Sequence, residues 1–170
     1  MEEYDVIIVG AGPAGSSSAY FNAKEGKKVL LLDKASFPRD KICGDGVTGK
    51  SLTILDEMGL GDEINGIKEI SSTGVLIVAP NQKELRIDIA SPEDPFSAFS
   101  IEREIFDNIL FQKAREMIQS NGGIFKQENV LKPIIEDGIM VGVQTKENHY
   151  KAKLVIGAGG YNCPISRTVL

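Results

Sequence analysis

The sequence predicts an α/β fold: a Rossmann-like nucleotide-binding domain, in which a parallel sheet is joined by an antiparallel β-meander, plus the start of a second, β-rich domain. Three observations support this fold class. Residues 5–9 form an apolar run typical of a parallel strand that is covered on both faces. Residues 10–15 fit the pattern G-x-G-x-x-G between that strand and a helical segment. Residues 28–33 form a second apolar strand, which ends on Asp33.

The first half of the chain continues this pattern with helices and a loop. Residues 13–24 read as a helix that follows the glycines, and residues 34–49 are polar and Gly-rich, as in a long functional loop. Helical spacing resumes at 50–58 and stops at Gly59, a residue suited to ending a helix.

The middle of the chain predicts a hairpin and a long helix. Two strand-like runs, 75–78 and 85–89, flank the turn 80–83. Apolar residues then recur every three and four positions between residues 105 and 118, which predicts an amphipathic helix that ends near residues 121–123.

The last part of the chain is rich in strands. Four candidates, with turns at 137–138 and 147–148, suggest a small antiparallel meander: residues 123–126, 130–136, 140–145 and 149–153. Residues 153–157 then form another apolar, parallel-type strand that leads into the glycines at 157–160.

Composition limits the classes of protein that are possible. The chain has 170 residues, a net charge of −5 and no apolar run of the ~18 residues that span a bilayer, so we expect a soluble protein. Its acidic start is unlike a signal peptide, which predicts a cytoplasmic location. The absence of a Lys/Arg cluster argues against nucleic acid as a partner. Cys43, Cys163 and the single His149 lack zinc-site spacing, so no metal site is expected.

The Gly-rich turn has a physical reason for each glycine. Gly10 makes the tight turn, Gly12 lets the backbone approach a pyrophosphate, and Gly15 allows close packing of helix and strand. Pro13 suits the first turn of the helix, whose free N–H groups and positive dipole favour an anion. Asp33 is placed to accept the hydroxyls of an adenosine ribose, and a carboxylate there disfavours a 2′-phosphate.

Two other interpretations of these residues stay open at this point. The turn could be a Gly-rich connection that binds nothing, with Asp33 as a solvated strand end. The dinucleotide could also be NAD instead of FAD, because both present the same ADP half to the same fold.

The loop after Asp33 decides between these cofactors by resemblance. Its segments Phe37-Pro38-Arg39-Asp40-Lys41 and Cys43-Gly44-Asp45-Gly46, together with Arg103, Phe106-Asp107 and residues 157–167, resemble the FAD-dependent geranylgeranyl reductases, of the digeranylgeranylglycerophospholipid reductase type. That family shares its fold with flavin aromatic hydroxylases. The resemblance implies FAD as the cofactor and reduction of carbon–carbon double bonds in isoprenoid chains. It also implies a prenyl lipid or prenyl diphosphate as substrate, NADPH or a ferredoxin-like protein as electron donor, and possible peripheral contact with a membrane.

The resemblance also implies a set of cofactor-binding residues. In that family the Cys43 loop passes near the flavin, Arg103 reaches the cofactor, and Val130 contacts the adenine end through its backbone. The full predicted set is Gly10, Gly12, Pro13, Ala14, Gly15, Asp33, Lys34, Cys43, Gly44, Gly46, Arg103, Val130 and Gly159.

Two of these residues have alternatives. Cys43 is the candidate catalytic residue, as a proton donor to the alkene, but it could equally be a small apolar residue. Arg103 could form a surface ion pair with Glu102 or Asp107 instead of contacting FAD.

Residues 157–167 resemble a second fingerprint of flavin hydroxylase-type enzymes, in which an Asp-Gly pair precedes a Ser and an Arg. Here Gly159 stands where the Asp is usual. This departure argues against direct reduction by NADPH and leaves a ferredoxin-like donor as the alternative. Alternatively, Gly159 and Gly160 only turn the chain after a strand.

We expect residues 1–70 and 100–170 to form an FAD-binding domain that is incomplete at its C-terminus, and residues 71–99 to be a partial hairpin of a β-rich substrate domain. Without sheet partners the hairpin would expose an edge and an apolar face. A truncated chain, or a short one that associates with a partner, is therefore expected. Two functional alternatives to the reductase stay open: a flavin monooxygenase or halogenase of related fold, and a non-catalytic FAD-binding module.

Overall fold

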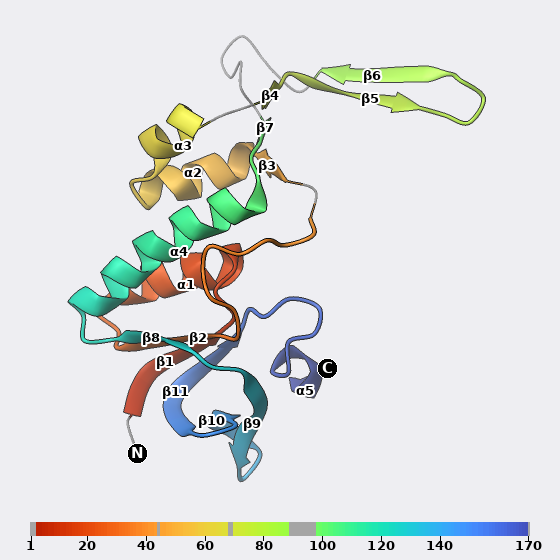
Figure 1. Ribbon diagram of the computed structural model, residues 1–170. Helices are drawn as coiled ribbons and strands as arrows, with labels where there is room; N and C mark the ends of the chain where they lie inside the picture. Colours follow the sequence, from red (N-terminus) through yellow and green to blue (C-terminus); the bar gives the residue numbers. More distant parts are fainter. Residues whose placement is uncertain (1–2, 44, 68–69, 89–97, 170) are drawn as a thin grey trace. The chain divides into compact units, whose positions relative to one another are not determined.

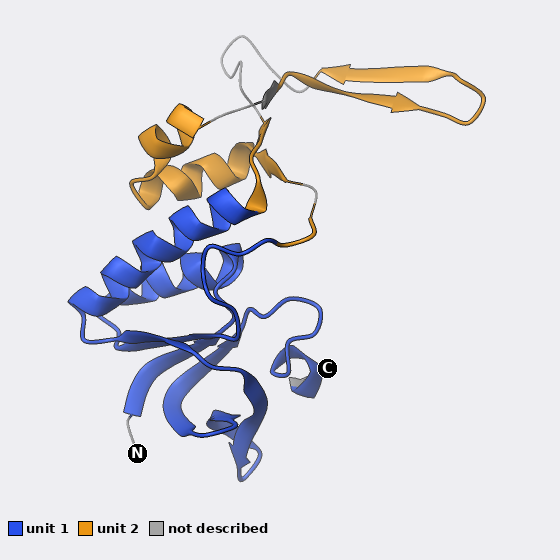
Figure 2. Ribbon diagram, viewed as in Figure 1, with its two compact units in different colours: residues 1–40, 104–170 blue, residues 41–103 orange. Residues whose placement is uncertain are grey.

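A computed structural model of the chain describes residues 3–43, 45–67, 70–88 and 98–169. These residues form two compact units, residues 1–40 with 104–170 and residues 41–103 (Figure 2). The unit boundaries differ from the predicted division into 1–70 with 100–170 and 71–99. That division was based on function, so it stays a prediction.

The first unit is built on a six-stranded mixed sheet. The strands β1 (Glu3–Val9), β2 (Val29–Asp33), β8 (Ile124–Gln127), β9 (Val130–Glu136), β10 (Ile139–Thr145) and β11 (His149–Gly157) occur in the order β8-β2-β1-β11-β10-β9. β1 lies between β2 and β11 and is parallel to both. The predicted α/β class with a parallel sheet and an antiparallel extension is confirmed.

Strand β8 corrects one expectation. The segment was expected in the antiparallel meander, but it pairs in parallel with β2 at the edge of the sheet. Gly123, which precedes the strand, makes this approach possible, because a Cβ there would lie 2.4 Å from the backbone oxygen of Val29. The pairing depends on a contact between segments far apart in the sequence, which local alternation of side chains cannot reveal.

Strand β11 also differs from its prediction. Residues 149–153 and 153–157 were expected as two strands, but they form a single one. Its first residues pair antiparallel with β10, from His149 to Lys151, and the strand then runs parallel to β1 as far as Gly157. The meander and the parallel sheet are therefore one continuous sheet.

Two helices, α1 (Pro13–Lys24) and α4 (Arg103–Ser120), lie over one face of this sheet (Figure 1). α1 has the bounds that the sequence predicted, and α4 lies where the apolar spacing placed it. The end of α4 is fixed to the end of α1 by a hydrogen bond of 2.8 Å from the Asn121 side chain to the Ala23 carbonyl. In this sheet, residues Val29 to Leu32 of β2 are completely buried. Each such side chain contributes roughly 1.5–3 kcal/mol of hydrophobic stabilisation.

The second unit contains short helices and strands. The helices are α2 (Gly49–Glu57) and α3 (Gly61–Ile67), and a three-stranded sheet has the order β3 (Gly46–Thr48), β7 (Ala98–Ser100), β4 (Ile70–Ser72). The last helical residue of α2 is Glu57. Gly59, the predicted stop, follows two residues later and adopts a φ of +71°. Helix α3 was not predicted. The β3–β7–β4 sheet was not predicted either, because three-residue strands lack a periodic pattern and their pairing is between distant segments.

The predicted hairpin is present as β5 (Gly74–Val78) and β6 (Glu84–Asp88), which pair along their whole length. Ile89, the expected last residue of the second strand, lies outside the described residues. The apolar side chains of both strands are exposed, as expected for a hairpin without further sheet partners. Within the described ranges, no helix has the length and apolar character needed to span a bilayer.

Candidate dinucleotide-binding site

The candidate site lies at the carboxyl ends of β1, β2 and β11 in the first unit. The Gly10 amide donates a hydrogen bond of 2.7 Å to the Leu32 carbonyl, and the Ala158 amide donates one of 2.7 Å to the Val9 carbonyl. The three strand ends are thereby held side by side. In open α/β sheets this edge is where ligands bind.

The glycines of the turn are required by close backbone contacts. Gly10 has a φ of +104°, and a Cβ there would lie 2.5 Å from the Ala158 carbonyl oxygen. A Cβ on Gly15 would overlap the Gly10 carbonyl oxygen, so this glycine allows α1 to pack directly on the strand. Gly12 is different, since the nearest group to its Cβ position is the Nη2 of Arg39, at 3.4 Å. The backbone at Gly12 therefore has room for a close-lying group.

Helix α1 begins at this turn with free amides. Gly12 is the N-cap, no side chain caps the helix, and its first turn, which contains Pro13 and Ala14, has no acidic residue. The Ser16 hydroxyl donates a hydrogen bond of 2.9 Å to the Ala11 carbonyl and fixes the turn from within. The unneutralised positive end of the helix is suited to a diphosphate.

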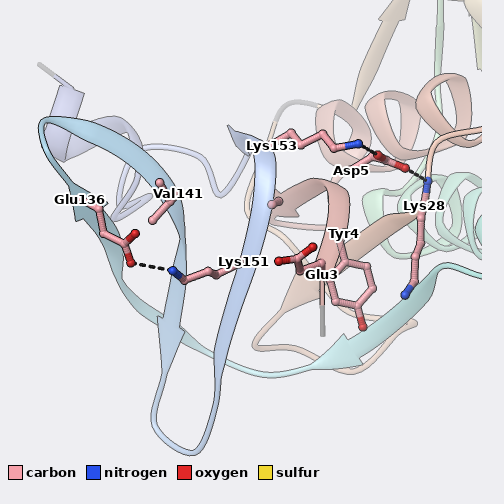
Figure 3. Close-up of a pocket in the computed structure, with 9 residues that line it drawn as sticks. Glu3, Tyr4, Asp5, Lys28, Glu136, Val141, Lys151 and Lys153 are labelled. Atoms are coloured by element: carbon pink, nitrogen blue, oxygen red, sulfur yellow. Dashed lines mark hydrogen bonds and ion pairs between the residues drawn. The ribbon is translucent and has the colours of Figure 1, made fainter. Parts of the chain in front are cut away.

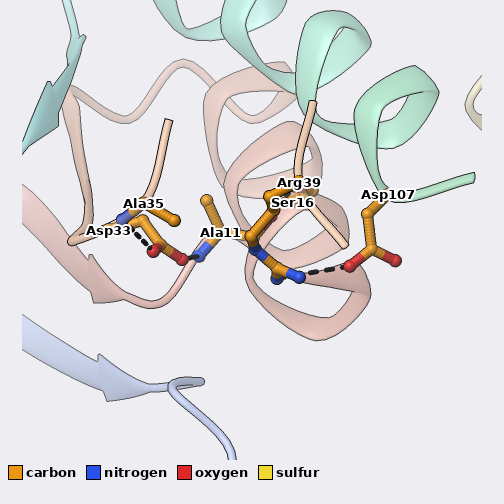
Figure 4. A network of polar contacts seen from close by, with 6 residues as sticks. All are labelled: Ala11, Ser16, Asp33, Ala35, Arg39 and Asp107. Atoms are coloured by element: carbon orange, nitrogen blue, oxygen red, sulfur yellow. Dashed lines mark hydrogen bonds and ion pairs between the residues drawn. The ribbon is translucent and has the colours of Figure 1, made fainter. Parts of the chain in front are cut away.

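Asp33 links this turn to the following loop. Its Oδ2 accepts a hydrogen bond of 2.7 Å from the Ala11 amide, and its Oδ1 accepts one of 2.9 Å from the Ala35 amide (Figure 4). A carboxylate has about four acceptor positions, so two remain for the hydroxyls of a ribose. Asp33 thus holds the Gly-rich turn in place, in addition to its predicted role as the acceptor for the ribose hydroxyls.

A small cavity of about 100 Å³ opens at this edge of the sheet. Its lining includes Gly10, Asp33, Lys34, Val130 and Gly159, five residues of the predicted set, all in the first unit. Their common position supports their grouping as one site.

Five residues that line this cavity were not predicted as site residues: Glu128, Asn129, Asn162, Cys163 and Pro164. They lie on two loops, before β9 and after β11, that only the sheet brings together. No motif marked Glu128 or Asn129. The other three stand in segment 157–167, which was recognised from its resemblance to a fingerprint, but no role was assigned to them.

Glu128 is held by a polar network. Its carboxylate accepts hydrogen bonds from the Tyr150 hydroxyl at 2.6 Å, the Thr145 hydroxyl at 2.8 Å and the Asn148 amide at 3.2 Å. Burial raises the pKa of Glu128, but these hydrogen bonds and the charge of Lys126 outweigh it, so the pKa lies below the usual glutamate value. Glu128 is therefore an anion that fixes the loop beside Val130.

Cys163 is buried in the same cavity wall. Burial raises the pKa of its thiol, but hydrogen bonds from the backbone at Ser166, Gly159 and Ile165 outweigh burial, and the net shift is downward. A Cβ on Gly159 would lie 3.2 Å from the Cys163 sulfur, so the missing aspartate of the second fingerprint would crowd this thiol.

Three further residues of the predicted set lie in the second unit: Cys43, Gly46 and Arg103. Cys43 is exposed and free, Gly46 begins β3, and Arg103 is the first residue of α4. Gly44 lies outside the described residues. The contacts of all four with FAD, and the alternative pairing of Arg103, stay predictions.

Asp107, one of the alternative partners considered for Arg103, forms an ion pair with Arg39. Nη2 of Arg39 lies 3.2 Å from Oδ2 of Asp107, whose side chain is completely buried (Figure 4). Both residues stand in the segments that carried the family resemblance, but their spacing of 68 positions gave no local signal of the pair.

A larger hollow, of about 440 Å³, lies at the opposite end of β1 (Figure 3). Four of its charged residues form ion pairs with one another, at 2.7 Å from Lys153 to Asp5 and 2.7 Å from Lys151 to Glu136. It faces the amino end of the parallel strands, which is not where these sheets bind ligands. The smaller cavity at the Gly-rich turn is therefore the candidate site.

The Gly-rich turn, the free end of α1 and Asp33 together define a dinucleotide-binding domain of the Rossmann-like type. The chain belongs to the family described as FAD binding domain, which matches residues 3–169. FAD is the cofactor of this domain, and the NAD alternative is set aside.

The known proteins that this chain resembles include a halogenase and prenyl-lipid reductases. A 1H-pyrrole-2-carbonyl peptidyl-carrier-protein brominase of Pseudoalteromonas luteoviolacea is 33% identical over 98% of this chain, and digeranylgeranylglycerophospholipid reductase 2 of Methanopyrus kandleri is 31% identical over 98%. The chain covers 40% of each of these proteins. A geranylgeranyl bacteriochlorophyll reductase-like structure from Thermoplasma acidophilum superimposes with a TM-score of 0.81 at 28% identity, over 98% of this chain and 42% of that one.

These relatives establish the FAD-dependent oxidoreductase family and confirm the resemblance to the geranylgeranyl reductases. Because reductases and a brominase match at similar identity, the particular reaction is a matter of proposal.

Proposed function

We propose that the protein uses its FAD to reduce carbon–carbon double bonds in isoprenoid chains of a prenyl lipid or prenyl diphosphate. The observation that carries this proposal is the pair of segments 37–41 and 43–46, which resemble the geranylgeranyl reductases in residue type and order. The similarity to a named reductase over 98% of the chain supports it.

Reduced FAD supplies a hydride in this chemistry. The first unit contributes cofactor binding: the turn 10–15 takes the diphosphate and Asp33 takes the ribose. Reduction of an alkene also requires a proton. Cys43 is free and exposed, and its thiol is the proton donor that we propose.

Two electron donors are compatible with the sequence, NADPH and a ferredoxin-like protein. We favour the ferredoxin-like donor, because Gly159 replaces the usual aspartate. A Cβ at this position would lie only 3.2 Å from the Cys163 sulfur, so a larger side chain would be crowded there. We further propose a cytoplasmic protein that makes peripheral contact with a membrane, since the proposed substrate is a lipid.

A halogenase or monooxygenase is the second candidate, because the brominase relative matches over as much of the chain as the reductase does. A non-catalytic FAD-binding module is the third, because cofactor binding is the one function that all three candidates share; the chain spans 40% of the length of these relatives. The two enzymatic candidates differ in what oxidises the reduced flavin: an alkene in one case, dioxygen in the other.

The test is a rapid-mixing experiment on the purified holoprotein, with its FAD reduced under anaerobic conditions. A geranylgeranyl compound should reoxidise the flavin and gain two hydrogens per double bond, whereas its fully saturated analogue should not. Replacing Cys43 by Ala should slow this reoxidation at least about ten-fold when the variant and the wild type are compared at equal FAD occupancy, as expected for loss of a general acid.

Reoxidation that requires oxygen and yields a brominated or hydroxylated product would instead establish the second candidate. FAD binding with turnover by neither route would establish the binding module.

A further inference from the structure

We propose that Arg39 binds the diphosphate of FAD and that the buried Asp107 is the positioning residue that holds it there. The inference goes beyond the proposed reaction, because it concerns how the chain binds its cofactor and does not depend on the substrate that is reduced.

The first step is the ion pair itself. Nη2 of Arg39 lies 3.2 Å from Oδ2 of Asp107, and the Asp107 side chain has no exposed area. A buried carboxylate is stable when a cation and hydrogen bonds compensate it, so the position of the guanidinium is tied to that of α4. The Arg39 side chain keeps 18% of its area exposed, so it is not sealed in the interior.

The second step is the location of the guanidinium. Nη2 is also the atom nearest to the space above Gly12, at 3.4 Å from the Cβ position there. Gly12 is the N-cap of α1 and the glycine over which a pyrophosphate passes in this fold. Figure 4 shows Arg39 between this Gly-rich turn, at Ala11 and Ser16, and Asp107. The cation therefore stands beside the free amides of the helix.

The third step is an unused donor. The Nη1 atom of Arg39 is shielded from solvent, and among the described residues it has no hydrogen-bond partner. A guanidinium has five N–H donors in a planar fork, and a phosphate oxygen is an acceptor that this fork fits well. Leaving a buried charged donor unpaired is costly, which is a reason to expect that a ligand pairs with it.

The fourth step is rigidity. The Cζ of Arg39 lies 4.9 Å from the centroid of the Phe37 ring, and Phe37 stacks on Phe111 with 4.3 Å between ring centroids. The aromatic pair holds the plane of the guanidinium from one side while Asp107 holds one of its ends. Such a preorganised cation loses little entropy when it binds an anion.

The test compares ADP with adenosine, which differ only in the diphosphate, and adds FAD as the complete cofactor. Dissociation constants of FAD, ADP and adenosine are measured on the apoprotein for wild type, Arg39→Gln, Arg39→Lys and Asp107→Asn. Arg115→Gln is the matched control, because this arginine lies on α4 and is exposed. The apoprotein melting temperature of each variant reports on folding.

Arg39→Gln should weaken FAD about 10-fold to 100-fold, the effect of a hydrogen bond between charged groups. The preference for ADP over adenosine should fall by the same factor, while adenosine affinity stays unchanged. Arg39→Lys should give an intermediate preference, because it keeps the charge but loses the fork. Asp107→Asn should lower the preference less than Arg39→Gln, and the double variant should lose no more than Arg39→Gln alone.

Equal loss of ADP and adenosine affinity in Arg39→Gln would mean a structural effect only and would overturn the proposal, as would an unchanged preference in Arg39→Lys. An unchanged preference in Asp107→Asn would overturn the role of Asp107. Because these measurements involve no turnover, their failure is distinct from failure of the proposed reduction.

Discussion

Strands β2 and β5 have nearly the same apolar sequence and opposite surroundings. Val29 to Leu32 in β2 are completely buried, whereas Val75 to Val78 in β5 expose between 46% and 57% of their area. β2 has β1 and β8 as partners and helices over one face, while within the described part of the chain β5 pairs with β6 alone. An apolar run thus predicts a strand in both places, but its burial depends on which other segments meet it.

The ends of the two strand pairs differ in the same way. At the carboxyl end of β2, Asp33 binds two amides from two different segments. At the end of the hairpin, the Asn81 side chain accepts only a local, exposed bond of 3.2 Å from the Lys83 amide. The first arrangement builds a site, and the second closes a turn.

The largest expected difference concerns the cores of the strands. Leu31→Ala should lower the free energy of unfolding by about 2–5 kcal/mol, because it leaves a cavity in a packed interior. Leu76→Ala, the same change in the hairpin, should alter it by about 0.5 kcal/mol or less, because the side chain is 57% exposed. Urea denaturation of both variants measures the contrast. Similar losses in the two variants would mean that the hairpin is packed against something in solution.

The second difference concerns the strand ends. Asp33→Ala should cost about 1–3 kcal/mol of unfolding free energy, because the Ala11 and Ala35 amides lose a charged acceptor. It should also weaken FAD at least about ten-fold through the ribose. Asn81→Ala should change neither quantity by a measurable amount. Denaturation and flavin fluorescence titration give the two values, and unaltered FAD affinity in Asp33→Ala would remove this residue from the site.

The smallest difference concerns acid groups and pH. The pKa of Glu128 lies below the ordinary glutamate value of 4.5, so its stabilisation is fully present above that value and is lost as pH falls through the folded-state pKa. Glu128→Gln should therefore lower the free energy of unfolding by about 1 kcal/mol at pH 7 and show a shallower decline between pH 5 and pH 3.

Asp88→Asn is the matched control in the hairpin. Asp88 pairs with Arg86, but both side chains are more than 70% exposed, so the pair should contribute almost nothing. Stability is measured by urea denaturation at a series of pH values. A decline in Glu128→Gln as steep as in the wild type would show that other carboxylates account for the acid sensitivity.

Much of the fold was predictable because its signals are local. α1 and the hairpin follow from spacing and turn residues, and the Gly-rich turn between β1 and α1 follows from three glycines with one acidic residue downstream. The parallel placement of β8 and the continuity of β11 were not predictable, since both depend on pairing between segments that lie far apart in the sequence.

The residues of the candidate site also fall into those with a local sequence signal and those without one. Gly10, Asp33 and Gly159 were identified from motifs, and the structure brings them to one cavity. Glu128 was missed, because its loop reaches the cavity only through the pairing of β9 and β10. The ion pair of Arg39 with Asp107 was not predicted, although both residues stood in segments that carried the family resemblance, because the two lie 68 positions apart.

The sequence by itself determined the class of the protein, a Rossmann-like domain with a Gly-rich turn after the first strand and an acidic residue at the end of the second, because these features are built from consecutive residues whose backbone geometry is constrained locally. The tertiary structure decided which side chains complete the site and which apolar strand is buried. These depend on ion pairs, cavities and sheet partners that exist only once distant segments have come together.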